Sequence, residues 1–320
     1  MYFKTKHKVE KKVTQPHDRF FKKLFSGKNE VMEFVKKTLP AEITKNLHLE
    51  TLELDQTEYV DNKLWTNWSD IVYNCKYGKS TTVKISLLFE HKSNIPIIPQ
   101  LQLLGYMLKI WWTQINHTQK LTVVIPIIFY HGKAKWTNKP FEEYFIGLDN
   151  ALQRFIPKFD YQLIDTSDFT DDEIIGLFEN LQLQIGVMVM KNIYDEQMLL
   201  QEIKKIFSNL NQLLNTEQGE MFFESIVAYL LYATSIDTQK YLEKMKTISQ
   251  KAEKRFVSTA MKLKTEGIKQ GIKQGIEQGS KDEKRKVALN LIKKGFNNET
   301  ISDVTGLKEK EVEQLKRDQL

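Results

Sequence analysis

Three polar residues in the first third of the chain could together carry out metal-assisted hydrolysis: Asp70, Glu90 and Lys92. Glu90 and Lys92 close an apolar run, 82–92, that is typical of a buried strand, and alternate residues of a strand lie on one face. A carboxylate and an ammonium group are costly to bury unless they have a partner or a task. An aspartate on a neighbouring strand would complete a Mg²⁺ site with a lysine beside it. That arrangement suits phosphodiester hydrolysis.

The turn between the two strands decides whether Asp70 can join this site. Residues 70–77 and the run that ends at Glu90 are expected to form a hairpin around 78–80. A three-residue loop, which is a common hairpin length, places Asp70 opposite Leu88 and one same-face step from Glu90. A two-residue loop would place Asp70 on the opposite face. The metal-site hypothesis therefore requires the three-residue loop.

The expected metal is Mg²⁺ or Mn²⁺, because the candidate ligands are oxygen atoms. Asp70 and Glu90 would supply carboxylates, and the backbone carbonyl of His91 would join them. The metal would lower the pKa of a bound water and offset charge on the phosphate. Lys92 would orient or activate that water and stabilise the transition state. The alternative is a Glu90–Lys92 ion pair at a frayed strand end, since an acidic-x-Lys triplet is common.

Hydrophobic patterning predicts the elements that position these residues. The first half of the chain reads as helices, three strands, a helix and a further strand, followed by one more strand. The Val/Ile-rich segment 121–130 is predicted to be a fully buried central strand. The order is that of an α/β protein. The expected ranges are helices 17–25, 30–39 and 99–115, and strands 49–60, 70–77, 82–92, 121–130 and 161–164.

The second half of the chain is predicted to be helical, with few strand signals. It is expected to pack as a helical cap or subdomain against the sheet. A low-complexity repeat, Gly-Ile-Lys-Gln, follows at 267–279. It reads either as a linker, flexible or loosely helical, or as a helix-pairing face, and the linker is favoured because each glycine costs helix stability. The expected helices are 173–181, 183–193, 196–214, 217–233 and 238–250.

The tail beyond the repeat shows three short helical patterns with a turn at Thr305-Gly306-Leu307, which is typical of a helix-turn-helix. Residues 251–320 carry 17 Lys/Arg and 11 Asp/Glu, so the tail holds the whole net charge of +6. A basic tail on a neutral body suggests contact with an anionic polymer. The acidic last helix, 308–316, argues against a recognition helix. Helix pairing through the repeat could form a homodimer, although no residue of the chain requires one.

Composition excludes several classes of protein. The chain of 320 residues is 41% hydrophobic, enough for a real core. A lone cysteine, Cys75, excludes a disulfide framework and a cysteine-rich zinc site. The basic N-terminus has no apolar core of a signal peptide, and the apolar segments are too short or too interrupted to cross a membrane. We therefore expect a soluble cytoplasmic protein with no membrane partner.

The spacing of Asp70 and Glu90-x-Lys92, followed by Gln102-x-x-x-Tyr106 on the next helix, resembles the PD-(D/E)XK nuclease superfamily. That superfamily has a restriction-endonuclease-like core of helix, three strands, helix and strand. The resemblance implies that Gln102 and Tyr106 contact the region of the active-site lysine or the DNA. The alternative is a surface glutamine and a core tyrosine.

More specifically, the chain resembles the Rpn family of recombination-promoting nucleases, also described as putative transposases. The resembling segments cover about residues 15–140 and are HDRFFK at 17–22, SD at 69–70, LLFEHKS at 87–93 and VIPIIFYHG at 124–132. Many family sequences carry glutamine where this chain has Lys92, so the lysine favours an active site. The resemblance implies a metal-dependent DNA endonuclease associated with recombination, mobile elements or defence.

Two further acidic residues are candidate components of the site. Asp18 could cap the first helix or support the site, and capping is favoured. Glu33 could be an extra ligand, although a solvated helix residue is favoured. The expected domains are a basic leader 1–14, a nuclease core 15–170, a helical subdomain 171–250, the repeat 251–280 and a small helical tail 281–320.

The sequence predicts a Mg²⁺-dependent enzyme that cleaves DNA, with Asp70 and Glu90 as metal ligands and Lys92 as the catalytic lysine. One rival is a non-catalytic DNA-binding or assembly protein derived from a transposon, although the intact Asp, Glu and Lys argue against it. A second rival is an RNase toxin that uses the same site. Nothing in the sequence separates DNA from RNA as the substrate.

Overall fold

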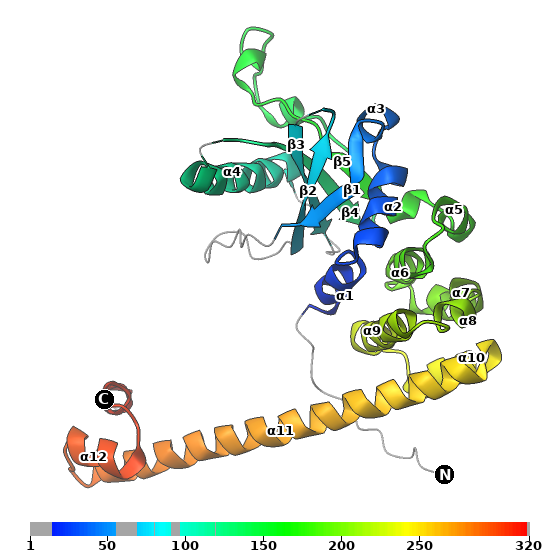
Figure 1. The fold of residues 1–320 in the computed structure, drawn as a ribbon. Coiled ribbons are helices and arrows are strands. Elements are labelled where there is room, and N and C mark those ends of the chain that lie inside the picture. The colour runs from blue at the N-terminus through cyan, green and yellow to red at the C-terminus, as the bar shows by residue number, and fades with distance from the viewer. Residues whose placement is uncertain (1–14, 56–68, 80, 91–96, 119, 319–320) are drawn as a thin grey trace. The chain divides into compact units, whose positions relative to one another are not determined.

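The fold is a mixed α/β structure with an additional C-terminal helical unit (Figure 1). The computed structural model describes residues 15–55, 69–79, 81–90, 97–118 and 120–318, with residues 69, 70, 86–90 and 118 described by their backbone only. Two compact units are present, and they divide the chain between Ala260 and Met261. The sheet lies in the first unit.

In the described residues, five strands form one sheet in the order β1-β2-β3-β4-β5. The first three strands pair antiparallel, whereas β4 and β5 run parallel to β3. The predicted order of helix, three strands, helix and strand is confirmed, and the Val/Ile-rich β4 is a largely buried interior strand between β3 and β5, as predicted. The strands are β1 (Leu47–Leu54), β2 (Ser69–Tyr77), β3 (Thr81–Glu90), β4 (Val123–Tyr130) and β5 (Gln162–Asp165).

Helices cover both faces of the sheet, because its strands carry apolar residues on both sides. On one face, Tyr73 of β2, Ile85 of β3 and Phe129 of β4 belong to the main core with residues of three helices. The other face packs on α4 (Pro99–Thr118) through a second set of residues, among them Val72 and Ile128. The three helices of the main face are α1 (Pro16–Leu24), α2 (Lys28–Thr38) and α6 (Leu181–Asn192).

The helices after the sheet share the main apolar core with it. The predicted helix 196–214 is divided near Phe207, and short helices occupy the connections between larger elements. The helices not yet named are α3 (Ala41–Thr44), α5 (Asp171–Leu177), α7 (Glu196–Ile206), α8 (Leu210–Leu213), α9 (Glu217–Ala233) and α10 (Thr238–Ile248), with the 3₁₀ turns η1 (Phe141–Tyr144), η2 (Gln153–Phe155) and η3 (Thr166–Asp168).

The glycine repeat is helical, and its role as a linker or as a helix-pairing face stays a prediction. The helix α11 (Gln250–Lys293) runs through the repeat without a break. Each glycine costs helix stability, but strong helix formers surround the glycines and extend a helix that has already begun. Ile268, Ile272 and Ile276 are all exposed.

The C-terminal unit contains the predicted pair of short helices after α11. These are α12 (Asn298–Thr305) and α13 (Glu309–Arg317), and Gly306 ends α12 with a φ of 66°. The left-handed conformation at that position favours glycine. Ala288, Ile301, Val312 and Leu315 form a small core of this unit.

Among the residues that the structure describes, no helix is both long enough and apolar enough to span a membrane.

Candidate active site

The hairpin register places Asp70 and Glu90 on the same face of the sheet. Tyr77 pairs with Thr81, and Asp70 pairs with Leu88. Residues directly opposite in a ladder share a face, as do alternate residues of one strand. Glu90 therefore lies one same-face step from the partner of Asp70. The register predicted from the three-residue loop is confirmed.

This shared face is the one that packs on α4. Val72, two residues after Asp70, packs with Met107 of α4. Tyr130 of β4 pairs with Glu90 of β3. Its side chain lies in a cluster with Leu103 and Tyr106, which both belong to α4. The helix therefore begins over the end of the sheet that carries Glu90.

The helix residues singled out in the sequence have different environments. Tyr106 is buried in the cluster around Tyr130, as expected of a core tyrosine. The Oε1 atom of Gln102 is buried and, within the described structure, has no hydrogen-bond partner. A buried amide oxygen normally has a donor or a cation beside it, so Gln102 is suited to contact a ligand on this face.

The donor chemistry fits a divalent metal of the Mg²⁺ type. Two carboxylates occupy same-face positions on adjacent strands, and the Gln102 oxygen lies on the covering helix. All three groups are the hard oxygen donors that Mg²⁺ prefers. His91 and Lys92 lie outside the described residues, so their roles stay predictions.

A buried ion pair lies farther along the same face. Lys84 of β3 donates hydrogen bonds to the Asp55 carboxylate and to Asn74 Oδ1, the latter at 2.9 Å. The Lys84 and Asp55 side chains are each only 7% exposed. Asp55 follows β1 and is held there because its N–H donates to the Val72 carbonyl oxygen. The pair therefore fixes the end of β1 against β2 and β3.

The histidines of two separate sequence motifs meet around one tyrosine. The ring centroid of Tyr194 lies 5.1 Å from that of His17 and 5.2 Å from that of His131. His131 is buried, and its Nδ1 donates to the Met190 carbonyl oxygen at 3.0 Å. His17 Nδ1 is 2.8 Å from the Tyr229 hydroxyl, and burial raises the pKa of Tyr229 well above its ordinary value. His131 therefore ties the end of β4 to α6, and His17 ties α1 to α9.

The glycine after His131 is required by a close approach. A Cβ atom at Gly132 would lie 2.2 Å from the Tyr130 hydroxyl oxygen. That hydroxyl donates to the Ala134 carbonyl oxygen at 2.8 Å and closes the turn after β4.

We expect Gly132→Ala to destabilise the fold by about 1–3 kcal/mol, because the tyrosine ring must move away from the new methyl group. Chemical denaturation followed by tryptophan fluorescence measures the loss. Gly176→Ala in α5 is the matched control, since a Cβ atom there would meet no neighbouring atom within 4 Å and alanine is the better helix former. Equal stability of Gly132→Ala and the wild type would contradict the steric argument.

Asp18 and Glu33 have surroundings that differ from those expected from the sequence. Asp18 does not cap α1, because the helix begins at Pro16 and places Asp18 in the first turn, where it pairs with Lys22 at 3.6 Å. Glu33 is not a solvated side chain. Its carboxylate accepts hydrogen bonds from the N–H groups of Glu179 and Asn180, just before α6 begins.

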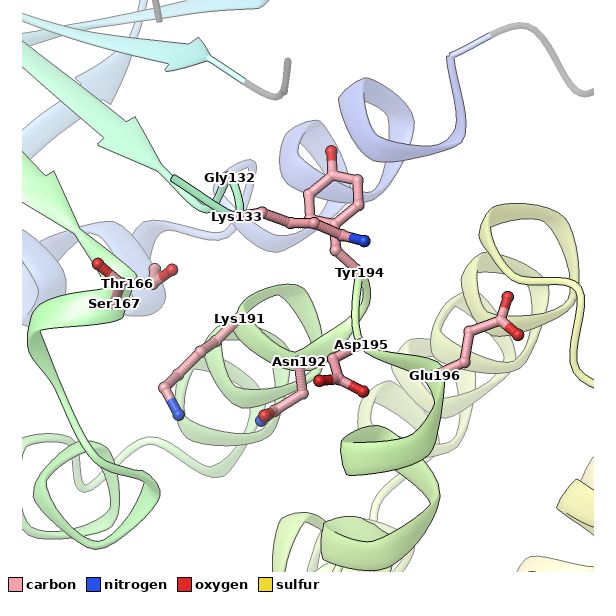
Figure 2. Close-up of a pocket in the computed structure, with 9 residues that line it drawn as sticks. All are labelled: Gly132, Lys133, Thr166, Ser167, Lys191, Asn192, Tyr194, Asp195 and Glu196. Atoms are coloured by element: carbon pink, nitrogen blue, oxygen red, sulfur yellow. The ribbon is translucent and has the colours of Figure 1, made fainter. Parts of the chain in front are cut away.

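A pocket that the sequence did not reveal lies at the carboxyl ends of β4 and β5 (Figure 2). Its volume is about 680 Å³. In open α/β sheets, ligands bind at the carboxyl ends of the strands. The predicted order of strands and helices was therefore the sequence signal that could have indicated a pocket here. The pocket is lined by Gly132, Lys133, Thr166, Ser167, Lys191, Asn192, Tyr194, Asp195 and Glu196.

These features define a mixed α/β protein with two acidic positions on one face of a hairpin and a ligand-sized pocket at the neighbouring strand ends. The chain belongs to the YhgA-like putative transposase family, whose profile matches residues 15–221. The expected family is thereby confirmed.

Several curated relatives carry names of this family. Recombination-promoting nuclease RpnD of Escherichia coli O157:H7 is 27% identical over 66% of this chain and 85% of its own length. The inactive recombination-promoting nuclease-like protein RpnE of E. coli K12 is 22% identical over 95% of this chain and 98% of its own length. Recombination-promoting nuclease RpnA of the same strain is 24% identical over 59% of this chain and 64% of its own length. No solved structure matches.

Proposed function

We propose that this protein is a divalent-metal-dependent DNA endonuclease with a restriction-endonuclease-like core. The observation that carries the proposal is the register that puts Asp70 and Glu90 on one face of adjacent strands. Family membership supports it, because RpnD and RpnA are named nucleases. The order of elements around the hairpin also agrees with the PD-(D/E)XK resemblance.

The proposed roles follow from the chemistry of each side chain. Asp70 and Glu90, with the His91 carbonyl, would hold Mg²⁺ or Mn²⁺. The bound cation supplies a water of lowered pKa and offsets phosphate charge. Lys92 would donate a hydrogen bond to the attacking water and stabilise charge on the phosphate. Gln102 would contact the substrate or the site from α4.

Two rivals to this proposal have different grounds. RpnE is named inactive although it aligns with most of this chain, so a non-catalytic DNA-binding protein is one alternative. Lys92 and both carboxylates favour the enzyme over that alternative. An RNase with the same site is the other, since phosphodiester hydrolysis of either nucleic acid requires the same groups.

Metal removal tests the proposal directly. We expect the full chain to cleave plasmid DNA with Mg²⁺ or Mn²⁺, and EDTA to abolish cleavage, because it would remove the cation that lowers the pKa of the attacking water and offsets charge on the phosphate. Excess Mg²⁺ should restore it. Parallel digestion of single-stranded RNA separates the RNase rival. Cleavage that persists in EDTA would contradict a metal-dependent enzyme, and no cleavage of either nucleic acid would favour the binding protein.

A further inference from the structure

The side of α4 that is turned away from the sheet is apolar along most of the helix. Leu103, Met107 and Ile110 bury the opposite side of α4 against β2 and β4. Six apolar positions, separated by three, four or seven residues, lie together on the other side. They are Leu101, Leu104, Gly105, Leu108, Trp112 and Ile115, and we name them the outer face of α4.

The large side chains of the outer face are open to solvent. Leu101 is 47% exposed, Leu108 45%, Trp112 62% and Ile115 41%. The side of a surface helix that faces water normally carries charged residues. In contrast, Lys109 is the only Lys, Arg, Asp or Glu from Pro99 to Thr118, and helical spacing places it about 100° around the axis from Leu108. A continuous apolar surface without charges is typical of a binding surface.

The outer face is symmetric about Leu108. Leu104 and Trp112 lie four residues before and after it, and Leu101 and Ile115 lie seven residues before and after it. The two partners of a two-fold interface present the same surface to each other. A two-fold axis at Leu108 between antiparallel helices therefore places Leu101 opposite Ile115 of a second copy. It also places the large Trp112 ring opposite Leu104 of the second copy.

Charge supports a second copy of α4 as the occupant. The outer face contains no charged residue, so pairing with itself creates no contact between like charges within the seam. The other exposed isoleucines on a helix each precede a charged residue, which makes them a poorer match for a neutral surface. These are Ile268, Ile272 and Ile276.

The extent of the outer face indicates how strong such a contact is. It runs for about 21 Å from Leu101 to Ile115, at a rise of about 1.5 Å per residue. Ile97 and Leu121 are also exposed and lie just beyond the two ends of α4. Antiparallel pairing brings Ile97 of one copy to the same end as Leu121 of the other. The contact is smaller than a standard interface of about 800 Å² per partner, so we expect a Kd of about 1–100 µM.

We propose that the outer face of α4 is the interface of a homodimer, in which two copies of α4 pack antiparallel about a two-fold axis at Leu108. This surface lies on the side of the helix that does not face Asp70 and Glu90. A dimer of a protein that cleaves no nucleic acid would therefore keep this interface and contradict only the proposed function.

Sedimentation equilibrium of the full chain tests the proposal. We expect the wild type to shift from monomer to dimer as its concentration rises. Leu108→Glu should raise the Kd at least about tenfold, because the two-fold axis places two carboxylates together in an apolar seam. Phe155→Glu is the matched control, since Phe155 is 77% exposed and lies in η2, outside the outer face. It should dimerise like the wild type, and all variants need melting curves that match it.

Other occupants of the outer face give different results. A wild type that is monomeric at about 100 µM, or a folded Leu108→Glu protein with the wild-type Kd, would overturn the proposal. Loss of the dimer in Ile272→Glu but not in Leu108→Glu would assign pairing to the glycine repeat and overturn the α4 interface. A monomer that binds phosphatidylcholine vesicles through Leu108 would assign the outer face to a lipid surface and overturn the homodimer.

Cysteine cross-linking tests the antiparallel direction. A mixture of Leu101→Cys and Ile115→Cys proteins should form a disulfide-linked dimer under mild oxidation, because antiparallel pairing brings these two positions within reach of each other. Either variant alone should not. The native Cys75 is buried, so the wild type provides the background. Efficient cross-linking of Leu101→Cys with itself would show a parallel pair and overturn the proposed arrangement.

Discussion

Glu90→Gln is expected to reduce metal-dependent DNA cleavage by a factor on the order of a thousand or more. The substitution keeps the size of the side chain but removes one of the two negative charges proposed to bind the cation. Asp70→Asn should have a similar effect, and Lys92→Ala should lower kcat while leaving metal binding in place. Initial rates of plasmid cleavage in Mg²⁺ measure the losses, and calorimetry with Mn²⁺ measures metal affinity.

Glu53→Gln provides the matched control, since Glu53 is an exposed glutamate on the edge strand β1. It should cleave at the wild-type rate. All variants need thermal melting curves that match the wild type, so that a loss of activity reports on the site and not on folding. Full activity of a well-folded Glu90→Gln protein would remove the carboxylate pair from the mechanism.

The second large effect is expected on stability, from Lys84→Met. The change leaves the Asp55 carboxylate buried without its lysine partner and takes a donor away from Asn74. Removing one partner of a buried ion pair costs about 3–5 kcal/mol. Urea denaturation followed by tryptophan fluorescence reports this loss well, because all five tryptophans of the chain precede residue 137.

A double-variant cycle identifies the cause of the loss. Asp55→Val combined with Lys84→Met should cost less than the sum of the single changes, because neither charge is then left without the other. Lys76→Met is the control, as Lys76 is an exposed lysine on the neighbouring strand β2. It should change stability by less than about 0.5 kcal/mol. Additive single effects would show that the two side chains are not coupled.

The local part of the fold could be predicted from the sequence. Side-chain alternation and the length of one turn together determine the pairing of Asp70 with Leu88, because both signals act within the same hairpin. The helix α4 and strand β4 also follow from the periodicity of their apolar residues. The order of elements around the hairpin was therefore predictable without tertiary information.

Features that depend on distant partners were not predictable. Lys84 in an apolar strand reads as a surface residue until Asp55 is brought beside it. Glu33 could be recognised as a hydrogen-bond acceptor only once α6 is placed next to α2. The N-cap assignment of Asp18 failed for a local reason, since Pro16 is well suited to the first position of a helix and starts it two residues earlier.

The candidate site draws its parts from very different distances along the chain. The positions of Asp70 and Glu90 are joined by one hairpin, whereas the pocket collects residues from Gly132 to Glu196. Contacts between near neighbours close small loops and form early in folding, and parallel strand pairs form late because their loops are long. The carboxylate pair is therefore the part of the site that a growing chain can assemble first, and the pocket is the part that it completes last.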